Sequence, residues 1–212
     1  MMANQPSIAE RLSGAMERRD EAPNVALAEE IAASKNKAAV SELVQLVQHG
    51  TTRQRNDAMK VLYEIGARDP ALIGGHCPVF LEALGSRTNR QVWGAMQALD
   101  SVAELRADEI AAELPNIIAA ADRGSVIAKD RCTSLLTKLA RSGYAEKAVP
   151  ILVERLKDAA PNQFPTYAEQ TAEVVTPAEK PGLIDIIRNR LSGITQRAKR
   201  ARMEKLLAKL NG

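Results

Sequence analysis

Aromatic residues are scarce in this chain of 212 residues, since two Phe, three Tyr and one Trp make up 3% of it. The core must therefore be built from Leu, Ile, Val and Ala, and side chains of this size suit helices that pack closely on helices. Apolar residues still make up 45% of the chain and charged residues 26%. These values are typical of a globular protein and exclude a disordered or collagen-like chain.

Cysteine is also rare. Cys77 and Cys132 cannot form a disulfide framework, and neither has the CxxC or Cys/His spacing of a structural zinc site. The first residues lack the basic and apolar regions of a secretory signal, and no apolar run approaches the roughly 18 to 20 residues that cross a bilayer. We therefore expect a cytoplasmic protein that holds no metal and no cofactor.

Helical periodicity accounts for most of the chain. Apolar residues recur at i, i+3, i+4 and i+7 over segments separated by short Gly, Pro, Ser, Asp or Asn breaks. Three pairs have the spacing of a capping box: Ser7 and Glu10, Thr88 and Gln91, and Thr176 and Glu179. No segment alternates convincingly as a strand would, so the sequence predicts an all-α fold.

The helical pattern repeats at an interval of 37 residues, which separates Leu62, Leu99 and Leu136. Small residues lie four positions before each of these leucines, at Ala58, Ala95 and Cys132. A first helix in each unit repeats too, with Ser41, Pro78, Pro115 and Pro150 at intervals of 37, 37 and 35. The pattern weakens after residue 150 but continues through Ala168 in a second helix and Pro181 in a first helix. Because one helix pair cannot bury its apolar face alone, we expect about four to five stacked pairs over residues 37–210.

This unit resembles the HEAT repeat, a relative of the armadillo repeat. The resemblance rests on the unit length, on the early proline of the first helix, and on a basic residue three positions before the small residue, as in Arg55 to Ala58 and Lys129 to Cys132. The second unit departs from the pattern, with Val92 at the basic position. The resemblance implies a right-handed, curved α-solenoid that holds protein partners, or less often nucleic acid, on its concave face. It implies no catalytic residues.

Residues 1–36 lie outside the repeat. Ile8, Leu12 and Met16, followed by Val25, Leu27 and Ile31, predict two shorter amphipathic helices. We expect residues 1–36 to form N-terminal capping helices and residues 37–212 to form the repeat array, as a single structural unit overall.

Catalytic motifs are absent from the sequence, which contains no GxSxG, HExxH or glycine-rich phosphate loop. His76 and Cys77 are adjacent and suggest an activated nucleophile, but the repeat places Cys77 at an apolar core position. Carboxylates are numerous and dispersed. We therefore expect no enzymatic activity. A HEAT-like DNA glycosylase stays open as a minor alternative, although one Trp provides few aromatics to handle a base.

Trp93 marks the face of the second helix that points away from the core. With the small residue taken as position zero, position −2 points about 160° away from the buried direction. The equivalent residues are Asn56 and Asp130, both polar, which indicates a solvent-facing ridge. A Trp side chain left exposed there forgoes the free energy gained by burying its large apolar surface. We therefore expect a partner, a second copy or the N-terminal segment to cover it.

The same outward arc predicts a partner-binding patch, because Trp, Tyr and Arg dominate binding hot spots. The patch consists of Arg53, Lys60, Tyr63, Arg90 and Trp93, and the next unit adds Asp130, Ser134 and Thr137 to the arc. The alternative is a solvated polar face on which the N-terminal helices cover one Trp.

The end of the chain is strongly basic. Residues 188–212 contain eight basic residues and one acidic residue, whereas the first 187 residues are net acidic. Such an amphipathic helix suits contact with nucleic acid or with an acidic surface. The candidate residues are Arg197, Lys199, Arg200, Arg202 and Lys205. A terminal cap with a basic outer face is the alternative.

Two functions therefore follow from the sequence. The first is a non-enzymatic scaffold for protein–protein interaction, which displays side chains in fixed register on a concave surface. The second is a nucleic-acid-binding array that uses the basic C-terminal helix. The sequence names no particular partner.

Overall fold

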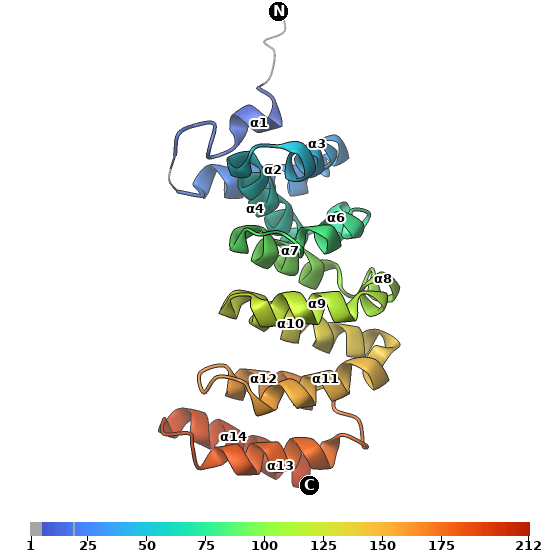
Figure 1. Cartoon of the computed structure of the whole chain (residues 1–212), viewed down its shortest axis with the longest axis vertical. Coiled ribbons are helices and arrows are strands. Elements are labelled where there is room, and N and C mark those ends of the chain that lie inside the picture. The colour runs from blue at the N-terminus through green and yellow to red at the C-terminus, as the bar shows by residue number, and fades with distance from the viewer. Residues whose placement is uncertain (1–5, 19) are drawn as a thin grey trace, which may run out of the picture. The chain divides into compact units, whose positions relative to one another are not determined.

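A computed structural model describes residues 6–18 and 20–212, and all regular structure in these residues is helical (Figure 1). The helices are α1 (Ile8–Arg11), α2 (Ala22–Ser34), α3 (Lys37–His49), α4 (Thr52–Arg68), α5 (Pro70–Gly74), α6 (Cys77–Ala83), α7 (Asn89–Val102), α8 (Ala107–Ala112), α9 (Leu114–Arg123), α10 (Val126–Leu139), α11 (Ala145–Lys157), α12 (Phe164–Ala172), α13 (Lys180–Leu191) and α14 (Arg197–Asn211). The segment η1 (Ala140–Tyr144) is a kink between α10 and α11, because Ser142 and Gly143 leave the helical conformation. The predicted all-α class is confirmed. None of the described helices combines the length and the apolar character of a membrane span.

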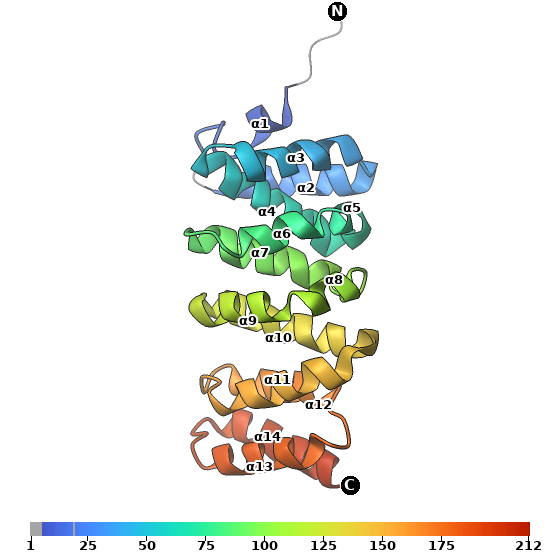
Figure 2. The same cartoon turned by 45° about the vertical axis from the view of Figure 1, so that its right-hand side comes forward.

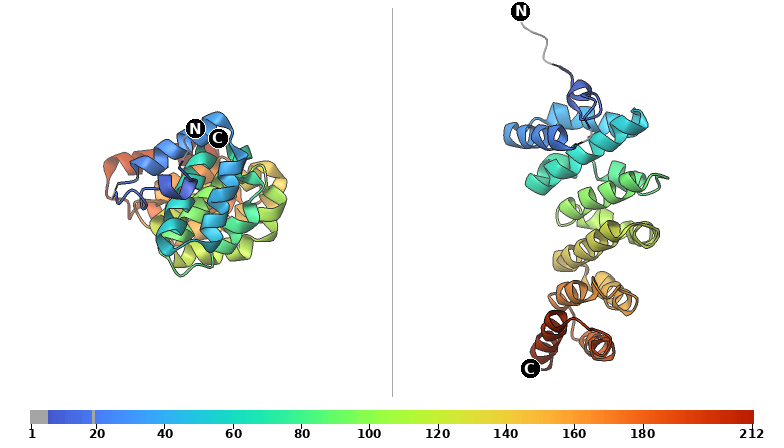
Figure 3. Two further views of the ribbon diagram at one scale, coloured as in Figure 1. Left: turned by 90° about the horizontal axis from the view of Figure 1, so that it is seen from above. Right: turned by 90° about the vertical axis from the view of Figure 1, so that its left-hand side faces the viewer.

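The helices form two compact units, residues 1–129 and residues 130–212, and the boundary falls within α10. The boundary that the sequence suggests between residues 36 and 37 stays a prediction. Each unit is built from layers of paired helices, which Figures 2 and 3 show from three further directions.

In the first unit, consecutive second helices lie side by side. Helix α4 packs against α2 on one flank and α7 on the other, while α3 pairs with α4 and α6 pairs with α7 (Figure 2). The α3–α4 and α6–α7 pairs are the ones that the 37-residue repeat predicts, whereas α2 lies outside the repeat. Leu62 and Leu99, which are one repeat apart, are both fully buried.

The close approach of α4 and α7 depends on small residues. A Cβ added at Gly94 would lie 2.6 Å from Cγ of Met59, and one added at Gly66 would lie 2.4 Å from Oγ of Ser101. Ala58 and Ala95 are fully buried. Larger side chains at these positions would push the two helices apart.

Two connections contain short helices that a two-helix repeat does not include. Helix α5 follows α4, and α8 follows α7, in each case before the next first helix. Asp69 explains the first of them, because its carboxylate accepts a hydrogen bond from the amide of Ala71 while Pro70 occupies the first helical position.

The predicted capping boxes have mixed outcomes. The box between Ser7 and Glu10 is confirmed, and a further box joins Thr51 to Gln54. The box at Thr88 is wrong, because the Thr88 side chain caps nothing and the Gln91 side chain instead donates to Oδ1 of Asn56 at 2.9 Å. The Thr176 hydroxyl accepts from the amide of Glu179, but α13 begins only at Lys180.

In the second unit, α11 packs against α12 and α13, and α14 packs against α12 and α13. Arg190 joins three of these helices. Its guanidinium donates to the carbonyl oxygens of Leu156 and Lys157 at the end of α11, and lies 4.4 Å from the ring centre of Phe164 on α12. One residue of the basic C-terminal region thus acts as a helix cap.

Leu99→Ala tests the stack of second helices. We expect this change to lower the free energy of unfolding by about 2–5 kcal/mol, because it opens a cavity at a fully buried site. The measurement is urea denaturation followed by circular dichroism. The control is Leu105→Ala, since Leu105 is 57% exposed and its truncation costs less than about 0.5 kcal/mol. Equal losses in the two variants would contradict this packing.

Candidate binding surface on the second helices

The outward positions of the second helices fall at −5, −2 and +2 from the small residue of each repeat. We call these side chains the outer face. They include Arg53, Asn56 and Lys60 on α4, Arg90, Trp93 and Gln97 on α7, Asp130 and Ser134 on α10, Gln163 directly before α12, and Thr166 and Gln170 on α12. All of them are partly or fully exposed, as the repeat predicts.

Position +5 does not belong to this face, which corrects the predicted arc. Tyr63 and Thr137 occupy this position and are only 8% and 4% exposed. The Thr137 hydroxyl donates to the carbonyl oxygen of Thr133 within its own helix. The exposed arc is narrower than a single free helix suggests, because each second helix also has neighbours on its flanks.

The predicted patch is brought together in the first unit. The rings of Tyr63 and Trp93 lie 5.6 Å apart at 54°, and Nζ of Lys60 lies 4.7 Å from the centre of the Tyr63 ring. Burial raises the pKa of Tyr63. Trp93 itself is partly exposed.

The N-terminal segment of the chain crosses this part of the outer face. The Glu21 carboxylate pairs with Lys60 at 3.3 Å and also with Arg90. Two of the three cations of the predicted patch, Lys60 and Arg90, therefore already have an acidic partner within the protein. Whether the patch also binds another protein stays a prediction.

A buried carboxylate fixes the same segment to α4. Asp57 is 7% exposed and accepts hydrogen bonds from the amide of Gly14 at 2.8 Å and from the side chain of Asn24 at 3.1 Å. Asn24 in turn accepts from the amide of Ser13 at 2.9 Å. Sequence reasoning treated Asp57 as one of many dispersed carboxylates and missed this role, because the partners lie 33 to 43 residues away.

An alternating series of charges continues from this point along the face. Glu64 pairs with Lys60 at 2.7 Å and with Arg68 at 2.6 Å, and Arg68 also pairs with Glu29 on α2 at 2.8 Å. Burial alone would raise the pKa of Glu64, but the hydrogen bonds from Lys60 and Arg68 outweigh burial and lower it.

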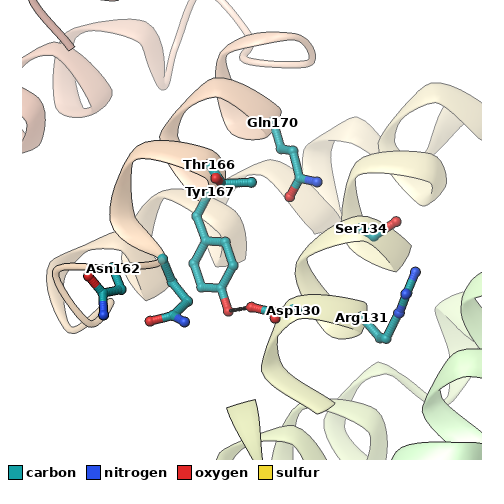
Figure 4. Close-up of a pocket in the computed structure, with 8 residues that line it drawn as sticks. Asp130, Arg131, Ser134, Asn162, Thr166, Tyr167 and Gln170 are labelled. Carbon is teal, nitrogen blue, oxygen red and sulfur yellow. Dashed lines mark hydrogen bonds between the residues drawn. The ribbon is translucent and has the colours of Figure 1, made fainter. Parts of the chain in front are cut away.

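In the second unit, the outer face forms a polar pocket of about 340 Å³ between α10 and α12 (Figure 4). Its lining is Asp130, Arg131, Ser134, Asn162, Gln163, Thr166, Tyr167 and Gln170. Asp130 and Ser134 are members of the predicted arc. The residues from α12 and the preceding turn were not predicted, because the repeat is weak after residue 150.

Hydrogen bonds connect the walls of the pocket, and part of the polar lining is left available to a ligand. The Tyr167 hydroxyl donates to the Asp130 carboxylate across the pocket (Figure 4). Burial and this hydrogen bond raise the pKa of Tyr167. Oε1 of Gln170 is buried and accepts no hydrogen bond from the described chain. The walls can therefore both donate hydrogen bonds to a ligand and accept them from it.

The predicted basic residues of α14 mostly contact their own unit. Lys199 donates to Asn162 at 2.8 Å, Arg202 to Glu169 at 2.9 Å, and Arg200 to Glu204 at 3.1 Å. Arg197 and Lys205 are exposed and make no side-chain hydrogen bond or ion pair with the described residues. Met203 and Leu210 are buried and fix the opposite side of the helix.

The other chemical candidates lie in the core or are dispersed. Cys77 is fully buried, and burial raises the pKa of its thiol, which disfavours the thiolate. Within residues 6–18 and 20–212, no group of three His, Cys, Asp or Glu side chains is arranged to hold a metal ion.

Two solved structures are similar to this arrangement. A designed armadillo repeat protein in complex with the peptide (KR)4 superposes with a TM-score of 0.71 at 13% identity, covering 99% of this chain and 100% of that chain. An engineered protein superposes with a TM-score of 0.64 at 16% identity, covering 97% of each chain. No family model and no curated protein matches the sequence. The fold is that of an armadillo-type α-solenoid, which agrees with the resemblance to HEAT repeats.

Glu64→Gln tests the charge series through its pH dependence. A lowered pKa in the folded state means that Glu64 stabilises the protein above its ordinary pKa of 4.5, and that this contribution is lost as the pH falls below that value. We expect the variant to be less stable than the wild type at pH 7 and the difference to shrink towards pH 3.

Urea denaturation at each pH measures that difference. Glu42→Gln is the control, because Glu42 is exposed on α3 and forms no ion pair with the described residues. A stability difference for Glu64→Gln that stays constant from pH 7 to pH 3 would contradict the assigned ion pairs.

Proposed function

We propose that this protein is a non-enzymatic interaction module that binds an extended polypeptide segment on the outer face of its second helices. The observation that carries the proposal is the use of this face within the chain. In the first unit, Glu21 of the N-terminal segment pairs with Lys60 and Arg90 on this face, and the amide of Gly14 donates to Asp57, which lies beside the face on α4. The face therefore already binds a segment of the chain through ion pairs, and the carboxylate beside it binds a backbone amide.

The pocket of the second unit is the proposed site for a partner. Asp130 and Thr166 occupy the repeat position of Asn56, while Ser134 and Gln170 occupy that of Lys60. The carboxamides, hydroxyls and carboxylate suit the alternating N–H and C=O groups of an extended backbone. The peptide bound by the similar designed protein supports this function.

We extend the proposal to the predicted patch and to the cellular setting. Arg53 and Trp93 would contribute contacts beside the N-terminal segment, since both are accessible. Cys77 and Cys132 are buried and not in disulfides, which suits a reducing cytoplasm.

Peptide binding measures the proposal directly. The probes are fluorescein-labelled decapeptides selected from a random display library on the wild-type protein, with (KR)4 as a defined comparison. We expect the double variant Gln163→Ala, Gln170→Ala to raise the Kd of the selected peptides about tenfold or more, because two hydrogen bonds to the backbone are lost. Fluorescence anisotropy gives the affinity.

Gln196→Ala is the matched control, because Gln196 lies in the same unit, is exposed and is outside the pocket lining. Equal affinities of the double variant and this control would contradict the proposed site.

Nucleic acid is the second candidate partner, favoured by the charge of the second unit. Residues 130–212 contain 15 basic and 9 acidic residues, a net charge of +6, and Arg197 and Lys205 are exposed. If this candidate is correct, single-stranded RNA or duplex DNA binds with an affinity that falls steeply with salt, and Arg197→Gln with Lys205→Gln reduces that slope. Absence of binding at low salt would exclude it.

A further inference from the structure

A second and smaller polar pocket, of about 120 Å³, lies in the first unit where the N-terminal segment crosses α4 and α7. Its lining is Ser13, Gly14, Arg18, Asp20, Glu21, Arg53, Asn56, Asp57 and Arg90. Three of these residues are arginines and three are carboxylates. The hydrogen bonds of each group decide what the pocket can bind.

The acceptors in the pocket are already used. Asp57 accepts from Gly14 and Asn24, as described above. Asp20 accepts from the Arg18 guanidinium at 3.0 Å and from the amide of Ala22 at 3.0 Å. Glu21 pairs with Lys60 and Arg90. Each carboxylate thus faces two donors within the protein.

Several donors in the pocket lack an acceptor among the described residues. Ser13 is 3% exposed and its hydroxyl has no hydrogen-bond partner in this part of the chain, and Nε of Arg90 is buried there without one. The Arg53 guanidinium is exposed and forms no hydrogen bond or ion pair with the described residues. A guanidinium can only donate, and a buried donor without an acceptor is costly. These donors are available to an incoming acceptor.

We propose that this pocket binds an oxyanion, either a phosphate or a carboxylate group. Guanidinium groups bind both through charge-assisted hydrogen bonds, and the Ser13 hydroxyl adds a neutral donor. The small volume and the three carboxylates in the lining favour a single compact group over a polyanion. This site is separate from the peptide pocket of the second unit and does not depend on it.

Titration of the 212-residue protein with inorganic phosphate and with N-acetylglutamate tests the proposal by ¹H–¹⁵N NMR. Sodium chloride at matched ionic strength is the reference. We expect saturable shifts of the Gly14 and Arg90 amides and no saturable shift at Gly143 in the second unit. Saturation by phosphate alone identifies a phosphate site, and saturation by N-acetylglutamate alone identifies a carboxylate site.

Two variants separate the site from general charge effects. Arg90→Lys keeps a cation opposite Glu21 but removes the buried Nε–H, and we expect the Kd of the saturating anion to rise about tenfold. Ser13→Ala removes a hydroxyl that makes no hydrogen bond with the described residues. We therefore expect this variant to keep the fold and to bind the anion more weakly. Arg87→Lys, at an exposed arginine outside the pocket, leaves the Kd unchanged.

Shifts that grow linearly with both anions as they do with chloride would overturn the proposal. So would equal affinities of Ser13→Ala, Arg90→Lys and the wild type. The Gln163 and Gln170 variants leave anion binding intact, so failure of the peptide site and failure of this site are distinguishable.

Discussion

The close side-by-side packing of the second helices is the constraint on which the rest of the structure depends. Gly66 and Gly94 bring α4 and α7 into contact at distances that no larger side chain allows. Because this packing buries the leucines at an interval of 37 residues, it also fixes which positions point outward on each helix. An outer face of defined register is therefore a direct consequence of how the core is built.

The outer face serves two purposes in the two units. In the first unit, Lys60 and Arg90 on this face pair with Glu21 of the N-terminal segment, and Asp57 beside the face binds the amide of Gly14. In the second unit, the equivalent positions line an accessible pocket with hydroxyl, carboxamide and carboxylate groups. Both uses rely on polar side chains on a rigid helical support, and the chemistry of each site is set by the residue types at a few register positions.

The sequence predicts the repeated part of this structure well, because the positions of the buried residues recur along the chain at a fixed interval. Leu62, Leu99 and the small residues at Ala58 and Ala95 give the helix pairs and their register. The outward placement of Trp93, Asp130 and Ser134 follows from the same periodicity. The attachment of Asp57 to Gly14 and Asn24 does not, since no periodic pattern links residues so far apart. The repeat does not predict Gln163 and Gln170, because α12 follows a long turn in which the repeat loses its spacing. Tyr63 is predicted on the exposed face but is buried, because a single-helix projection ignores the helices on its flanks.

The central claim is that polar side chains on the outer face and directly beside it hold polypeptide, and amide hydrogen exchange in Asp57→Ala, where the carboxylate beside the face is removed, measures it most directly. The account predicts that the Gly14 amide exchanges about tenfold faster or more in this variant, because its buried acceptor is lost, while the amides in the middle of α7 keep their protection. Glu42→Ala, on the exposed side of α3, should change neither. Unaltered exchange of Gly14 in Asp57→Ala would contradict the account, because the segment would then be held by something other than this face.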